Sequence, residues 1–157
     1  MYDAFLPRLF YFFCYKVGDP QVAEELTAVT FEKAWRSRRG FCKDRGQVQA
    51  WLFGIARHVA GDYLRKPFRE VALDEMPELS DNPSLDEDLQ RQLDFQKVSR
   101  ILSTFPERDR ELISLKYGAE LTNREIAGLA GLSESNVGTI LSRVVSKLRK
   151  EWEQDHG

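Results

Sequence analysis

Apolar residues recur at every third or fourth position along most of the chain, and they do not alternate with polar residues as they do in strands. Turn-forming residues separate the periodic segments, as Gly18-Asp19-Pro20 does near the N-terminus. The pattern predicts helices over residues 4–17, 21–38, 48–66, 85–103 and 107–117, and Pro7 fits the first helix if it lies in the first turn. We therefore expect an all-α fold.

The stretch 121–148, LTNREIAGLAGLSESNVGTILSRVVSKL, has the pattern of a helix-turn-helix. Gly131 supplies the tight turn because glycine enters left-handed backbone geometry without steric cost, Leu132 fills the corner, and Ser133 is a natural N-cap. The apolar faces of the two helices are expected to contain Ile126, Ala127, Ala130, Val137, Ile140, Leu141, Val144 and Leu148. Outward-facing Glu134, Ser135, Asn136, Thr139 and Arg143 place polar groups where a DNA major groove would accept them.

Helical periodicity fails between residues 67 and 82, and this part of the chain is interrupted by Pro67, Pro77 and Pro83 and by an acidic composition. Residues 70–88 contain eight acidic residues and no lysine or arginine, a composition that cannot bury a core. We therefore predict two small helical domains, residues 1–67 and 91–157, joined by a flexible acidic linker at residues 68–90.

Charge is distributed unevenly, although the formal net charge of the whole chain is only −2. Residues 1–69 carry a net charge of +5, residues 70–106 carry −6, and residues 107–157 carry −1. Because phosphate contacts normally supply much of the affinity for DNA, this balance argues against tight autonomous DNA binding. A stand-alone helix-turn-helix regulator nevertheless remains an alternative on these residues, as does a helical hairpin that contacts only protein.

The sequence contains no residue pattern that indicates catalysis, a metal or another cofactor. Cys14 and Cys42 lack neighbouring ligands and are expected to be reduced thiols of the core in a cytoplasmic protein. His58 and Asp62 lie four residues apart and are interpreted as a polar pair on a helix surface. The apolar run at residues 10–15 is too short for a membrane span, so an intracellular protein is expected. Because no catalytic pattern is present, we also expect that the protein is not an enzyme.

Both halves of the chain resemble the extracytoplasmic-function sigma factors of bacterial RNA polymerase. The N-terminal half carries GDPQVAEELTAVTFEKAWR and WLFGIARHVAGDYLRK, and the C-terminal half carries FPERDRELISLKYGAELTNREIAGLAGLSESNV and LSRVVSKLRK, in the order and at the separation of that family. The resemblance implies an alternative sigma factor with sigma region 2 in residues 1–67 and region 4 in residues 91–157. Its implied partners are core RNA polymerase, promoter DNA and an inhibitory anti-sigma factor.

The resemblance also assigns roles to particular residues. Docking on core polymerase is assigned to Glu24, Glu25, Phe31 and Trp35, although Phe31 and Trp35 could instead pack in the core. Capture of the melted −10 promoter element is assigned to Arg38, Arg39, Lys43, Trp51, Arg57, His58 and Arg65. Recognition of the −35 element is assigned to Ser135, Asn136, Thr139 and Arg143.

The sequence departs from the family pattern at three places. Thr27-Ala28-Val29 replaces the usual amide and acid of the docking helix, His58 stands where asparagine is common, and Gly138 stands where a cation is common. These departures affect polymerase docking, base choice in the −10 element and a phosphate contact at the −35 element, respectively. They leave a degenerate sigma-like binding protein as a further alternative.

Overall fold

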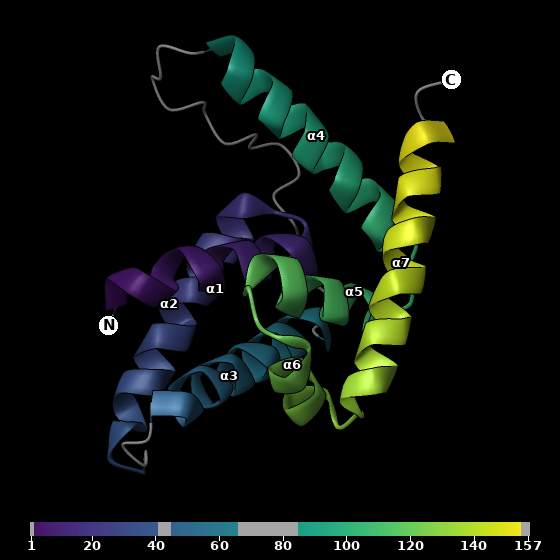
Figure 1. Cartoon of the computed structure of the whole chain (residues 1–157). Helices are drawn as coiled ribbons and strands as arrows, with labels where there is room; N and C mark the ends of the chain where they lie inside the picture. The colour runs from purple at the N-terminus through teal and green to yellow at the C-terminus, as the bar shows by residue number, and fades with distance from the viewer. Residues whose placement is uncertain (1, 41–44, 66–84, 155–157) are drawn as a thin grey trace.

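The structure is a computed structural model that describes residues 2–40, 45–65 and 85–154. Within these ranges every regular element is helical, which confirms the predicted all-α class (Figure 1). The elements are α1 (Tyr2–Val17), α2 (Pro20–Arg36), η1 (Arg38–Gly40), α3 (Arg45–Arg65), α4 (Leu85–Ser103), α5 (Glu107–Ile113), η2 (Ser114–Gly118), α6 (Asn123–Ala130) and α7 (Glu134–Gln154). Most of the predicted acidic linker, residues 68–84 of 68–90, lies outside the described residues.

Capping interactions explain where the first helices begin and end. The Asp19 carboxylate accepts the backbone N–H of Gln21 at 2.9 Å, and Pro20 occupies the first helical position of α2. The prediction that Pro7 lies in the first turn of α1 is wrong, because α1 begins at Tyr2 and Pro7 falls in the second turn. Its ring removes one backbone donor near the end of the helix, where the loss disturbs few hydrogen bonds.

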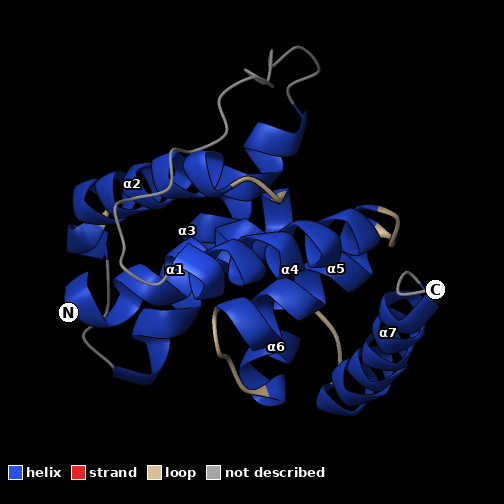
Figure 2. Cartoon of the chain, turned by 90° about the horizontal axis from the view of Figure 1, so that it is seen from above, coloured by secondary structure: helices blue, strands red, loops and turns tan. Residues whose placement is uncertain are grey.

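Helices α1, α2 and α3 pack against one another (Figure 2). The core between them is rich in aromatic side chains. The Phe12 ring lies edge-on to Phe13 and Phe53, with ring centroids 5.1 and 6.0 Å away, and all three side chains are fully buried. Val29 and Thr30 are neighbours on α2, and helical periodicity alone allows either to face the core. Thr30 is the buried residue, and its hydroxyl donates to the Leu26 carbonyl at 2.7 Å, so its burial leaves no polar group unsatisfied.

The C-terminal helices form a second unit, in which α4, α5 and α6 each contact the long helix α7. Helix α4 packs along α7, where the Lys97 ammonium lies 3.9 Å from the centre of the Trp152 ring. The predicted helix over residues 107–117 is instead divided between α5 and the single π-helical turn η2. The Ala119 N–H reaches back five residues to the Ser114 carbonyl at 3.0 Å, which is the wider spacing that defines this turn.

The two units are packed against each other and share one continuous apolar core. Figure 1 shows η2 lying over α1, and a side chain at Gly118 would place its Cβ 2.7 Å from the Phe12 backbone. Glycine is therefore required at this close approach. The Arg8 Nε donates to the Ala119 carbonyl at 2.7 Å, and the Arg110 Nε donates to the Tyr15 carbonyl at 2.8 Å. The sequence could not place the two domains relative to each other.

Candidate nucleic-acid and polymerase interfaces

Helices α6 and α7 form the predicted helix-turn-helix, and three local features fix its geometry. Thr122 and Glu125 make a reciprocal capping box, with the two hydrogen bonds at 3.1 and 2.9 Å. Gly131 ends α6 in the left-handed conformation with φ 70°, as predicted. The Ser133 hydroxyl accepts the Asn136 N–H at 3.0 Å and so caps the start of α7, also as predicted.

The face of α7 predicted to contact DNA is exposed. Ser135, Asn136, Thr139 and Arg143 are all exposed along the first three turns, and Glu134 is exposed beside them. The opposite face is held in the core by four buried residues, which were predicted from the apolar spacing: Val137, Ile140, Leu141 and Val144. The structure therefore brings the predicted −35 residues together on one solvent-facing surface.

A groove of about 290 Å³ runs beside this face, between α7, η2 and the start of α6. Its lining contains two cations and no carboxylate: Lys116, Tyr117, Asn123, Leu141, Ser142, Val145, Ser146 and Arg149. The Asn123 Oδ1 is buried there without a hydrogen-bond partner. Sequence reasoning missed this groove because it combines positions about thirty residues apart that no single helical period connects.

Gly138 also contributes to the shape of this region. A Cβ at Gly138 would lie 3.6 Å from the Asn123 Nδ2, an ordinary contact distance, so glycine is not required there for packing. The groove takes its two cations from Lys116 on η2 and from Arg149, which lies eleven residues beyond Gly138 on α7.

The outer face of α2 carries the residues predicted to dock on polymerase. Glu24 and Glu25 are exposed, Phe31 is half-buried, and Trp35 is 66% exposed. The exposure of Trp35 rules out the alternative in which this side chain packs in the core. The Arg38 guanidinium lies 3.9 Å from the centre of the Trp35 ring and donates to the Trp35 carbonyl at 2.7 Å, so the indole is held outward.

A second groove, of about 480 Å³, adjoins this face between α1 and α2. The groove is mostly apolar, and the Tyr11 side chain on its wall is 53% exposed. The other lining residues are Leu6, Pro7, Phe10, Glu24, Thr27 and Ala28. Thr27, one of the family departures, is buried and donates its hydroxyl to the Ala23 carbonyl at 2.7 Å. The sequence analysis named exposed residues on α2 alone and missed the α1 side of this groove, because the α1 residues also fit a helical core stripe.

The residues predicted to capture the −10 element do not form one surface. Arg38 and Arg39 are exposed near the end of α2, His58 and Arg65 are exposed on α3, and Trp51 is half-buried. Lys43 lies outside the described residues. Arg57 is half-buried, and its Nε donates to a carboxylate oxygen of Glu111, in the C-terminal unit, at 2.6 Å.

His58 and Asp62 were predicted to form a polar pair on the helix surface, but the main partner of Asp62 is Arg65. The Asp62 carboxylate accepts a hydrogen bond from the Arg65 guanidinium at 2.6 Å. This bond, with smaller contributions from nearby positive charges, holds the pKa of the Asp62 carboxyl below its usual range. Arg65 is thereby positioned along α3 by an exposed ion pair that nucleic acid could displace.

The Cys14 thiol should be chemically inert in the folded protein. Burial, aided by the nearby Asp19 carboxylate, raises the pKa of Cys14 to about 12, so the thiol stays protonated at pH 8. In a Cys42→Ser variant we expect no reaction of Cys14 with a chromogenic disulfide reagent until denaturant is added. Between pH 9 and 12 the unfolded chain ionises this thiol while the folded chain does not, so the stability should fall as the pH rises. A rapid reaction in native buffer would contradict the burial.

Across residues 2–40, 45–65 and 85–154, no three side chains of His, Cys, Asp or Glu gather to hold a metal ion. In the same part of the chain, no helix has the length and apolar character needed to cross a membrane.

Known proteins resemble this chain across both units. The sigma-70 region 2 family matches residues 1–69, and the sigma-70 region 4 family matches residues 101–150. The chain belongs to the sigma-70 family of RNA polymerase sigma factors, in its extracytoplasmic-function group. It is 28% identical over 152 residues to the sigma factor SigM of Bacillus subtilis, covering 95% of this chain and 91% of that protein.

A second relative and a solved structure also match most of this chain. The sigma factor RpoE of Cereibacter sphaeroides is 28% identical over 151 residues, covering 92% of this chain and 78% of the relative. A solved structure of the sigma factor RpoE of Bartonella quintana, in complex with the anti-sigma factor NepR, matches with a TM-score of 0.72. That match has 22% sequence identity and covers 97% of this chain and 94% of the other, so it supports the fold. The chain is therefore an alternative sigma factor that directs promoter-specific transcription initiation, and its partners are core RNA polymerase and promoter DNA.

Proposed function

We propose that this sigma factor docks on core RNA polymerase through the outer face of α2 and recognises the −35 element through α7. The observation that carries the proposal is the exposed polar face of α7, which a capped turn and a buried apolar stripe hold in place. Ser135, Asn136, Thr139 and Arg143 would contact base edges. Lys116 and Arg149 in the adjoining groove would contact phosphates.

Recognition of the −10 element belongs to the N-terminal unit in this proposal. Arg38, Arg39, Lys43, Trp51, Arg57, His58 and Arg65 combine cations with an aromatic ring, which is the composition that binds unstacked bases and their backbone. Residues 1–67 and 91–157 would act as regions 2 and 4, with residues 68–90 between them. The polymerase carries out the chemistry, so we assign the chain no catalytic activity of its own and no cofactor.

The cellular setting follows from these partners. Because polymerase and promoter DNA are cytoplasmic in bacteria, we place this protein in the cytoplasm. The solved relative is bound to an anti-sigma factor, and we propose that a separate anti-sigma protein inhibits this chain as well. A stand-alone DNA-binding regulator is less well supported, because it leaves the region 2 match over residues 1–69 without a role.

The test is transcription from a pooled promoter library by purified core polymerase, with and without the chain. We expect discrete start sites that depend on the chain, with shared upstream sequences at both elements. Trp35→Ala should weaken binding to core polymerase by about thirtyfold, because an exposed tryptophan is a typical interface hot spot. The matched control is Leu64→Ala, which removes a 45% exposed apolar side chain from α3.

Two results would count against the proposal. Binding of polymerase without new start sites would favour the degenerate sigma-like alternative. Equal losses in Trp35→Ala and Leu64→Ala would remove α2 as the specific docking face. Circular dichroism should show the same helicity in both variants, since neither side chain is buried.

A further inference from the structure

Three side chains that carry or gain a positive charge lie near the exposed Asp62 carboxylate, on the surface shared by α2 and α3. His58, Asp62 and Arg65 follow one another on α3 at spacings of four and three residues, which places them on one face of the helix. The Arg65 guanidinium donates to the Asp62 carboxylate at 2.6 Å, and both side chains are more than half exposed. Lys33 is exposed on α2, which packs against α3.

The electrostatics of Asp62 place Lys33 and His58 close to this carboxylate. The hydrogen bond from Arg65 is the main cause that holds the pKa of the Asp62 carboxyl below its usual range, and the positive charges of Arg65, Lys33 and His58 act in the same direction. The carboxyl is therefore ionised throughout the neutral range. One carboxylate thus faces two permanent cations and one histidine.

The bond between Arg65 and Asp62 is easily exchanged for another anion. An ion pair between exposed side chains contributes little to stability, because both partners remain solvated. A guanidinium matches the geometry of a phosphate as well as that of a carboxylate. A phosphodiester group that approached this surface could therefore replace Asp62 as the partner of Arg65 at little cost.

An aromatic side chain on the same face favours a nucleic-acid strand as the source of that phosphodiester. Trp51 lies seven residues before His58 on α3 and is half-buried. Sites for single-stranded nucleic acid combine aromatic rings, on which bases stack, with cations that hold the backbone. The surface around Asp62 has both of these components.

The charged groups that face His58 come from its own helix and from α2: Asp62, Arg65 and Lys33. Arg57, the neighbour of His58 in the sequence, is bonded to Glu111 of α5 and to the α6 backbone. Helix α1 also contacts α3, but its Arg8 donates to Gln49, nine residues before His58. The charge of His58 is therefore controlled by the groups around Asp62.

We propose that Lys33, His58 and Arg65 bind one phosphodiester group of melted single-stranded DNA, and that His58 takes up a proton from solvent when the strand binds. The site depends on the proposed role of the N-terminal unit in −10 capture, and it adds Lys33 of α2 to that surface. The phosphate replaces Asp62 as the partner of Arg65. Two anions then lie beside the imidazole and stabilise its protonated form, so the strand binds more tightly as the pH falls.

The sequence makes this proton uptake accessible to experiment. Histidine is the side chain whose charge ordinarily changes between pH 5 and 8, and the chain contains only two histidines, His58 and His156. Asp62 is already ionised in this range, and the Cys14 thiol stays protonated. The pH dependence of strand binding should therefore be carried by His58.

The test measures binding of the full-length chain to two fluorescently labelled single strands by anisotropy, at pH 6 and at pH 8. One strand carries the −10 element of the promoters recovered above, and the other is oligothymidine of the same length. Oligothymidine reports on the phosphate site, because backbone contacts are independent of sequence. His58→Asn removes the titrating group, and His156→Asn is its matched control.

Two further variants alter the other members of the site. Asp62→Asn removes the competing carboxylate, and its matched control is Glu32→Gln, which removes an acid from the exposed ion pair with Arg36 on α2. Lys33→Gln removes the cation on α2, and Lys150→Gln removes an equally exposed cation from α7. None of these side chains is buried, so the fold should be retained in every variant.

We expect the wild type and His156→Asn to bind both strands about fivefold more tightly at pH 6 than at pH 8, and His58→Asn to bind them equally at the two pH values. Asp62→Asn should bind about threefold more tightly than Glu32→Gln at either pH. Lys33→Gln should reduce the slope of log affinity against log salt by about 0.7, the value for one phosphate contact on a single strand, relative to Lys150→Gln.

Each part of the site can fail separately. An undiminished pH dependence in His58→Asn would overturn proton uptake by this residue. Equal affinities of Asp62→Asn and Glu32→Gln would overturn the exchange of Asp62 for phosphate, and an unchanged salt slope in Lys33→Gln would remove Lys33 from the site.

The two strands separate this inference from the function on which it depends. If the wild type binds the −10 strand no better than oligothymidine, the assignment of −10 recognition to the N-terminal unit fails, while the oligothymidine data still decide the phosphate site. Absence of binding to either strand would overturn both.

Discussion

Replacing Asn136 and Arg143 together by alanine is expected to abolish transcription from −35-dependent promoters while leaving polymerase binding intact. Each side chain is exposed on the recognition face, and a good base contact of this kind contributes about 1–3 kcal/mol of discrimination. Loss of both should lower initiation at cognate promoters by roughly two orders of magnitude or more. Single-round transcription with purified polymerase measures this effect.

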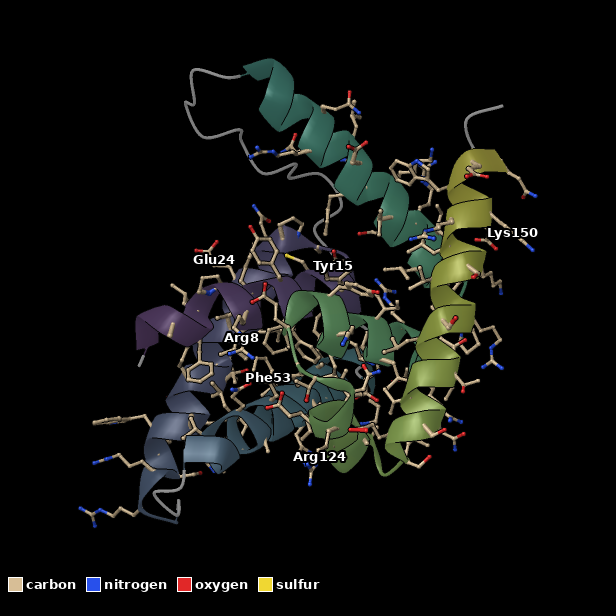
Figure 3. All side chains as sticks on the ribbon, in the orientation of Figure 1. Arg8, Tyr15, Glu24, Phe53, Arg124 and Lys150 are labelled. Carbon is tan, nitrogen blue, oxygen red and sulfur yellow. The ribbon has the colours of Figure 1, made fainter. Side chains whose placement is uncertain are left out.

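The matched control for the loss of charge is Lys150→Ala. Lys150 lies on the same helix, about 10 Å further along its axis from Arg143, and points into solvent (Figure 3). It should lower transcription by less than threefold. If the double variant retained full promoter-specific activity, α7 would not be the −35 recognition element. A loss of polymerase binding in the double variant would show damage beyond this face.

The largest loss of stability is expected from Phe12→Ala. Phe12 is fully buried, lies edge-on to Phe13 and Phe53, and supports the close approach of Gly118. Truncating a buried phenylalanine typically costs about 3–5 kcal/mol, which is a large part of the stability of most domains. Because the apolar core is continuous, the whole chain should unfold in one transition. Phe12→Ala should shift the midpoint of this transition to a lower urea concentration.

The neighbouring Tyr11→Ala provides the comparison for this prediction. Tyr11 is 53% exposed and contacts the Phe10 ring from the outer side of α1, so its removal should cost about 1 kcal/mol or less. Urea unfolding followed by circular dichroism measures both variants. Two separate transitions, with only one of them shifted by Phe12→Ala, would contradict a shared core.

Local signals in the sequence were sufficient to predict the helix-turn-helix. The conformation of Gly131, the cap at Ser133 and the buried face of α7 each depend on residues within one or two helical turns. The same kind of signal predicted where α4 begins, at Leu85. The capping box of Thr122 and Glu125 has a known sequence signature and could have been found in the same way.

Contacts between distant segments were beyond the reach of the sequence. Arg57 and Glu111 are 54 residues apart, and an arginine suits a phosphate as well as a carboxylate, so spacing could not indicate its partner. The π-helical turn at η2 was missed because its residues also continue a helical pattern, and its end at Gly118 is explained by contact with α1. The sequence left the exposure of the Trp35 side chain open for a related reason, since only tertiary packing determines it.

The acidic first residue of α7 has a consequence for where the free protein resides in the cell. The exposed face formed by Glu134, Ser135, Asn136, Thr139 and Arg143 carries one acid and one cation, so its net charge is close to zero, and the whole chain carries −2. In our proposal the cations that face the duplex are Lys116, Arg143 and Arg149, so binding should release only about three counterions and depend weakly on salt. Bulk chromosomal DNA would then retain little of this protein, and most of it would remain free to encounter polymerase by diffusion.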